Sequence, residues 1–101
     1  MSIDLTDELA VDSEIRNRYG MTLRGLHGFF VKKMRRYGKA SLAVMSAEKE
    51  FVCGFIWVVN PDKTVSARCF SKGSNKTPLV IEYTGIDGAW EEYKKLVLDN
   101  L

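Results

Sequence analysis

Residues 22–37 read TLRGLHGFFVKKMRRY, and this stretch combines a clear helical period with a concentrated charge. Leu23, Leu26, Phe30, Met34 and Tyr37 follow one another at intervals of three or four residues, which is the apolar stripe of an amphipathic helix. We therefore predict a helix that buries this whole stripe, Tyr37 included, in the core.

The opposite side of this predicted helix is cationic. At about 100° per residue the basic side chains collect away from the stripe, together with two glycines. The candidate binding residues on this side are Arg24, Gly25, Gly28, Lys32, Lys33, Arg35 and Arg36. Each glycine costs a helix about 1 kcal/mol relative to alanine. Two explanations remain open: a partner approaches the backbone closely, or the first turn is loosely wound and the helix proper starts near Phe29.

The charges on either side of this helix are segregated along the chain. All five charged residues before Ile15 are acidic, whereas residues 16–39 hold eight basic residues and no acidic one. The acidic segment could lie against the basic helix, or the two could face different partners. The net charge of +2 and the pI near 8.6 are too mild to indicate nucleic-acid binding by themselves.

Glycines mark the ends of the predicted helices. Residues 3–19 suit one helix or two short ones, which Gly20 would end, and Gly38 would end the basic helix. Residues 41–46, SLAVMS, suit either a strand or a helical turn. We favour a strand that forms a hairpin with the next segment.

The second half of the chain has the pattern of a sheet. Residues 51–59, FVCGFIWVV, are apolar on both alternating faces, as in a central strand covered on both sides. Residues 64–71 alternate polar and apolar, residues 79–84 suit a last strand, and Asp87 should cap a final helix. The expected fold is α+β: N-terminal helices, an antiparallel meander of three to four strands, and a C-terminal helix packed on the sheet, in one small domain over residues 1–101.

The sequence also predicts where the protein works. It has no secretory leader, and its longest apolar run is far shorter than the roughly 20 residues that span a bilayer. Two thiols, Cys53 and Cys69, do not make a disulfide scaffold. We therefore expect a cytoplasmic protein with no membrane contact.

Little in the sequence indicates chemistry. The one histidine, His27, borders the apolar stripe, so we interpret it as a core or boundary residue rather than a catalytic base. No spacing of cysteine and histidine matches a zinc site, and we expect neither a metal nor a cofactor. Lys72 and Lys76 lie in the loop SKGSNKT, a weak anion-binding candidate without the spacing of a nucleotide loop. No motif specifies even a metal-free nuclease, so we predict no enzyme.

Two functional hypotheses remain. The first is a small non-enzymatic protein that binds a larger protein, as inhibitors and adaptors do, including those that phages direct against host enzymes that handle nucleic acid. The second is nucleic-acid binding through the basic helix, residues 24–36. We prefer the first, because the net charge is small and no known nucleic-acid-binding signature is present. The oligomeric state stays open, since edge strands and the glycine-bearing helix could each form a symmetric contact.

Overall fold

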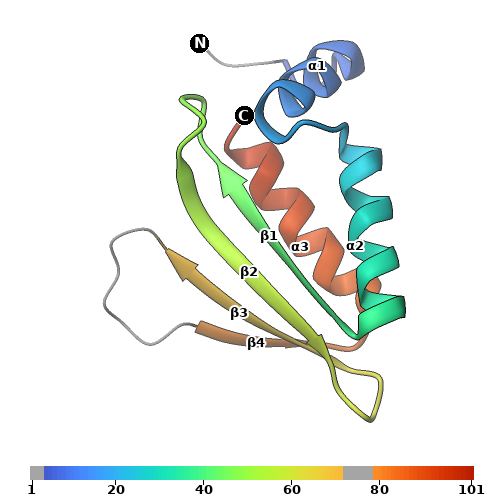
Figure 1. Ribbon diagram of the computed structural model, residues 1–101. Coiled ribbons are helices and arrows are strands. Elements are labelled where there is room, and N and C mark those ends of the chain that lie inside the picture. The colour runs from blue at the N-terminus through green and yellow to red at the C-terminus, as the bar shows by residue number, and fades with distance from the viewer. Residues whose placement is uncertain (1–3, 72–78) are drawn as a thin grey trace.

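The computed structural model describes residues 4–71 and 79–101 of the chain. In these ranges the elements are α1 (Glu8–Tyr19), α2 (Leu23–Tyr37), β1 (Lys39–Met45), β2 (Phe51–Val59), β3 (Val65–Ser71), β4 (Leu79–Tyr83) and α3 (Ile86–Asp99). The strands form one antiparallel sheet in the order β1-β2-β3-β4, so the chain meanders (Figure 1). The predicted α+β fold is confirmed, and so is the hairpin, in which residues 41–45 belong to β1 while Ser46 follows the strand.

α1 and α2 both end at a glycine, as predicted. Gly20 and Gly38 have φ angles of 78° and 68°, a left-handed conformation that other residues adopt only with strain. At the start of α2, Thr22 Oγ1 accepts a hydrogen bond from the Gly25 amide at 3.1 Å. Asp87 does not cap α3 as expected but lies within its first turn, where a negative charge complements the helix dipole.

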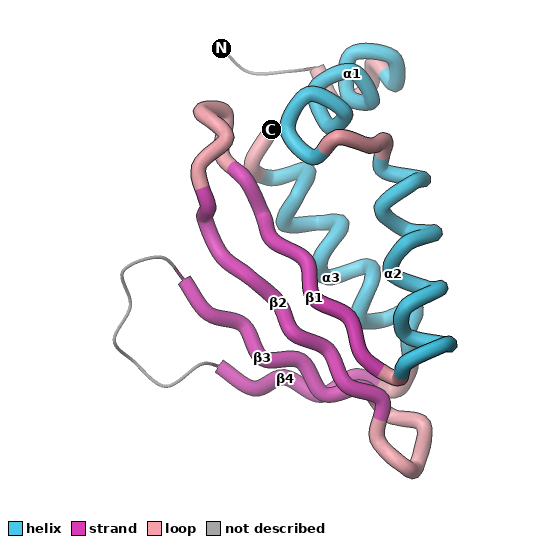
Figure 2. The backbone as a smooth tube through the Cα atoms, viewed as in Figure 1, coloured by secondary structure: helices cyan, strands magenta, loops and turns pink. Residues whose placement is uncertain are grey.

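α2 and α3 lie together on one face of the sheet, and the core forms between these two layers (Figure 2). Trp57 of β2 is fully buried at the centre of this core. Its ring stacks on Phe55 at 5.3 Å between centroids and meets Phe30 of α2 and Tyr93 of α3 edge-on, at 4.8 and 5.6 Å. Edge-to-face aromatic pairs add about 0.5–1.5 kcal/mol each beyond the burial of their area, so this cluster joins both helices to the sheet.

A buried arginine attaches α1 to the rest of the fold. The Arg18 side chain is only 2% exposed, and its Nε lies 2.6 Å from Glu14 Oε1. Its Nη1 donates to the carbonyl oxygen of Asn100, at the end of α3. A buried charge is costly unless it is paired and hydrogen-bonded, so these partners hold the guanidinium, and with it α1, in place.

Two tyrosine hydroxyls bond the backbone of β1, which lies at one edge of the sheet. Tyr93 Oη donates to the Ala43 carbonyl oxygen at 2.8 Å. Tyr19 Oη accepts from the Met45 amide at 2.9 Å. Both contacts join a helix to this edge strand.

Two expectations about burial are wrong. Residues 51–59 form a strand that is covered on one face only. The helices lie on one side of the sheet, and on the other side Ile56 and Val58 are 41% and 45% exposed. Tyr37, expected in the core, is 55% exposed. Its ring instead carries Lys33 Nζ at 4.9 Å and the Arg36 guanidinium at 5.4 Å, contacts between cation and ring that form at the surface.

We predict that Tyr93→Phe lowers the free energy of unfolding by about 1 kcal/mol, the usual net value of one hydrogen bond. The substitution leaves the Ala43 carbonyl oxygen without its Tyr93 donor and keeps the ring in the core. Urea denaturation followed by tryptophan fluorescence measures the change.

Tyr83→Phe is the matched control for this substitution. The Tyr83 hydroxyl is buried and has no hydrogen-bond partner among the described residues. Its removal should be neutral or stabilising, because an unpaired buried hydroxyl costs free energy. Equal destabilisation by the two substitutions would contradict the role assigned to the Tyr93 hydroxyl.

Candidate functional site

The structure places four of the predicted cations, Arg24, Lys32, Arg35 and Arg36, on one exposed side of α2, whereas Lys33 is half-buried. The helix is regular from Leu23 onward, so the explanation by a loosely wound first turn is wrong, and Gly25 and Gly28 lie inside the helix. A Cβ atom on Gly28 would meet nothing within 4 Å, whereas one on Gly25 would lie 3.3 Å from the Met21 Cβ. The surface of α2 at Gly28 is therefore open backbone.

The basic side chains around these glycines form no ion pair within the described residues, although Asp12 of α1 lines the same hollow as Arg24. Arg24, Lys32, Arg35 and Arg36 are exposed, and Lys33 folds over the rings of Phe29 and Tyr37. Within residues 4–71 and 79–101 the one ion pair joins Arg18 to Glu14, so no ion pair links the acidic N-terminal segment to α2. Lys72 and Lys76, the weak loop candidates, lie outside the described residues.

His27 is exposed and contacts one core ring, whereas the two cysteines pack in the sheet. The His27 ring lies 4.8 Å from the Trp90 ring, between centroids, at the boundary between α2 and α3. Cys53 and Cys69 are free thiols on neighbouring strands. Burial, with Cys69 beside it, raises the pKa of the Cys53 thiol to about 11, so this thiol stays protonated at neutral pH. A protonated thiol is a poor nucleophile.

The open face of the sheet is a surface that sequence reasoning missed. We use this name for the outward side chains of β2, β3 and β4 on the face without helices. Its large apolar members are Ile56, Val58, Phe70 and Val80, which are 41%, 45%, 37% and 58% exposed. By register the same face also carries Ser66, Arg68 and Glu82. Antiparallel sheets usually present polar side chains to water on such a face, so four large apolar side chains among these polar ones are unusual for a free surface.

The strand register places a cation in the middle of these apolar residues. Ile56, Arg68 and Val80 are direct neighbours across β2, β3 and β4. With Val58, Asn60 and Ser66 they line a hollow of about 530 Å³. Asn60 Nδ2 donates to Ser66 Oγ at 2.9 Å, so these polar groups satisfy each other. Arg68, in contrast, has no hydrogen-bond or ion-pair partner in the described part of the chain.

An aromatic pair extends this apolar face toward the other end of β2. The rings of Phe51 and Phe70 stack at 6.1 Å between centroids. They cover Gly54, where a Cβ atom would lie 2.9 Å from the Phe70 ring. The missing side chain of Gly54 thus lets both rings lie flat on the sheet, a way in which aromatic residues protect a strand glycine.

The sequence contained a signal for this surface. In residues 51–59 the side chains on both faces of the strand are apolar, and this is typical of a strand with both faces covered. The expectation failed only in assuming that the chain itself covers both. Among the described residues, the helices cover only one of these two faces.

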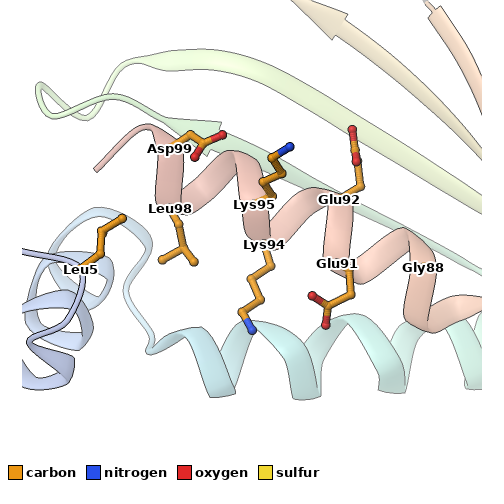
Figure 3. A pocket seen from close by; sticks show the side chains of 8 residues that line it. All are labelled: Leu5, Gly88, Glu91, Glu92, Lys94, Lys95, Leu98 and Asp99. Carbon is orange, nitrogen blue, oxygen red and sulfur yellow. The ribbon is translucent and has the colours of Figure 1, made fainter.

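Another hollow, of about 520 Å³, lies along the outer surface of α3 near Leu5. Figure 3 shows that its charged side chains leave α3 in opposite directions, with Glu91 and Lys94 on one side and Glu92 and Lys95 on the other. No set of polar groups converges there, so this hollow is a poorer candidate for a binding site than the open face.

The described residues contain neither a cluster of metal ligands nor a helix that could cross a bilayer. They contain no group of three or more His, Cys, Asp or Glu side chains placed to hold a metal ion. None of the helices in residues 4–71 and 79–101 combines the length and the apolarity that crossing a bilayer requires.

Comparison with protein-family models, curated proteins and solved structures finds no match to this chain. The candidate site is therefore assigned from geometry alone.

We predict that Gly28→Ala raises the free energy of unfolding by about 1 kcal/mol. The new methyl group meets open space, and alanine is the better helix former by about that amount. Gly25→Ala is the matched comparison, with a smaller gain because its methyl group presses on the Met21 side chain. Urea denaturation of the two variants measures both; no gain for Gly28→Ala would contradict a regular helix at this position.

Proposed function

We propose that this protein is a small non-enzymatic binding protein that contacts a larger protein through the open face of its sheet. One observation carries the proposal: four large apolar side chains, Ile56, Val58, Phe70 and Val80, lie together and exposed on a face that no helix covers. Contiguous apolar surface rimmed by polar residues is typical of interaction sites.

The chemistry of the open face supports a protein as the ligand. Covering apolar surface gains about 25 cal/mol per Å², and the cores of protein interfaces are enriched in aromatic residues and arginine. The open face has both, in the Phe51 and Phe70 pair and in Arg68. An arginine between two apolar neighbours suits a carboxylate, which its guanidinium binds through two parallel hydrogen bonds.

The hollow favours a partner segment of a particular shape. At about 530 Å³ it is large enough for several side chains and is lined on one side by aliphatic groups. An amphipathic helix with aliphatic anchors and one carboxylate facing Arg68 would fill it, in the manner of a helix in a groove. The protein would then act by occupying the surface of its partner, as an inhibitor or adaptor of a larger enzyme.

We extend the proposal to the place of action, the cytoplasm. Cys53 and Cys69 are free and lie on neighbouring strands. Thiols that stay unoxidised suit a reducing compartment. The partner would be a cytoplasmic enzyme, and one that handles nucleic acid is among the candidates.

The test places a photo-crosslinking amino acid at position 80 on the open face and, in a second protein, at position 9 on α1. Leu9 is also an exposed apolar residue, at 83%. A protein that is cross-linked in native cells through position 80 but not through position 9 is identified as the partner. The partner is then purified, and its binding to this chain is measured by calorimetric titration. We expect saturable binding with one site per chain.

The decisive variant is Val80→Glu, with Leu9→Glu as its control. We expect Val80→Glu to weaken binding by about 30-fold or more, because an unpaired charge would be buried against the apolar surface of the partner. Leu9→Glu should leave affinity unchanged, and both should keep the circular dichroism spectrum and melting temperature of the parent. Equal affinity for the two variants would refute a role for the open face. Cross-linking only to a second copy of this chain would replace the larger partner by a homodimer.

A further inference from the structure

The cationic side of α2 is a second surface, separate from the open face of the sheet. The helices cover one face of the sheet and the open face is the other, so a ligand on α2 would not compete with one on the open face (Figure 1). α2 carries five cations and no acidic residue, and no described carboxylate forms an ion pair with any of them. Such a charge attracts a polyanion.

The cations lie on both sides of a line of open backbone. At 100° per residue, Arg24 and Arg35 fall about 20–40° to one side of Gly28, and Lys32 and Arg36 about 40–80° to the other. From Arg24 to Arg36 the helix rises about 18 Å, at 1.5 Å per residue. The exposed ridge is therefore narrow at Gly28, where no side chain projects, and charged along both flanks.

This arrangement matches the major groove of duplex DNA. The groove is about 12 Å wide and admits one α-helix, with a phosphate strand along each wall. We propose that α2 lies in the major groove and that its flanking cations bind phosphates of both strands. Gly28 faces the groove floor and brings no side chain to the base edges. The contact is thus with the backbone and independent of base sequence.

Three other polyanions fit less well. Anionic membranes bind basic helices that insert an apolar face, but Leu26, Phe30 and Met34 are at most 3% exposed and belong to the core. Duplex RNA has a major groove too deep and narrow for side chains to enter. Single strands bind to exposed rings, and the exposed rings of Phe29 and Tyr37 already carry Lys33 Nζ, at 5.5 and 4.9 Å.

The experiment is a fluorescence-anisotropy titration of the full chain with a labelled 20-base-pair DNA duplex, from 50 to 200 mM salt. With four phosphate contacts, the logarithm of the affinity should fall with the logarithm of salt at a slope of about −3.6. Lys32→Gln and Arg35→Gln should each weaken binding and reduce that slope by about 0.9. Lys95→Gln, the same charge change at an exposed position of α3, should leave the slope unchanged.

A second variant separates groove contact from mere attraction by charge. Gly28→Gln leaves the net charge unchanged but places a long side chain on the ridge. We expect it to weaken duplex binding by about tenfold while Gly28→Ala binds as the parent does, because the long side chain would clash with the groove floor and move the flanking cations away from the phosphates. Circular dichroism of both variants confirms that α2 stays helical.

The outcomes that would overturn the proposal are distinct from those of the open face. The salt slope could fall as much in Lys95→Gln as in Lys32→Gln, or Gly28→Gln could bind as the parent does. Either result would mean that DNA is held only by diffuse attraction to the charge of the protein. Tighter binding to duplex RNA, to single strands or to vesicles with phosphatidylserine would assign a different polyanion. Flat salt dependence would remove the site altogether. Val80→Glu should bind DNA as the parent does, so failure of either surface leaves the other testable.

Discussion

The packing of Trp57 between α2 and α3 is the constraint on which the rest of the structure depends. Its ring contacts Phe30 and Tyr93, one from each helix, and is fully buried between them. Both helices must therefore lie on the same face of the sheet. Because the helices pack on that face, the other face of β2 is left without a covering helix, although its side chains are also apolar. The exposed apolar surface on the open face is thus a consequence of where the core forms.

Much of the fold could be predicted from local sequence, because the relevant interactions are local. The stops at Gly20 and Gly38 and the period of α2 involve residues within one or two helical turns of each other. Tyr37 shows the limit of this reasoning. It shares the angular position of the buried stripe, but its burial depends on what lies beside the last turn of the helix, and there the ring meets cations instead of core.

The two candidate surfaces differed in how far the sequence could predict them. The cations of α2 follow from helical period alone, since 100° per residue fixes their side of the helix. The open face requires the register that sets Arg68 between Ile56 and Val80, on strands that are separate in the sequence. Composition indicated that both faces of β2 are buried, but not which layer would cover each. The period of a sequence predicts which side chains share one face of a strand or helix. Which element packs on that face depends on the tertiary structure.

The two tyrosine hydroxyls on β1 have a consequence for self-association. An edge strand with free amide and carbonyl groups can template the addition of a strand from another molecule, and this is a common route to aggregation. Tyr93 and Tyr19 already engage the Ala43 carbonyl and the Met45 amide. A strand from a second molecule would have to displace them to pair along that part of β1. Strand addition along that part of β1 is therefore disfavoured relative to the opposite edge of the sheet, which is the short strand β4.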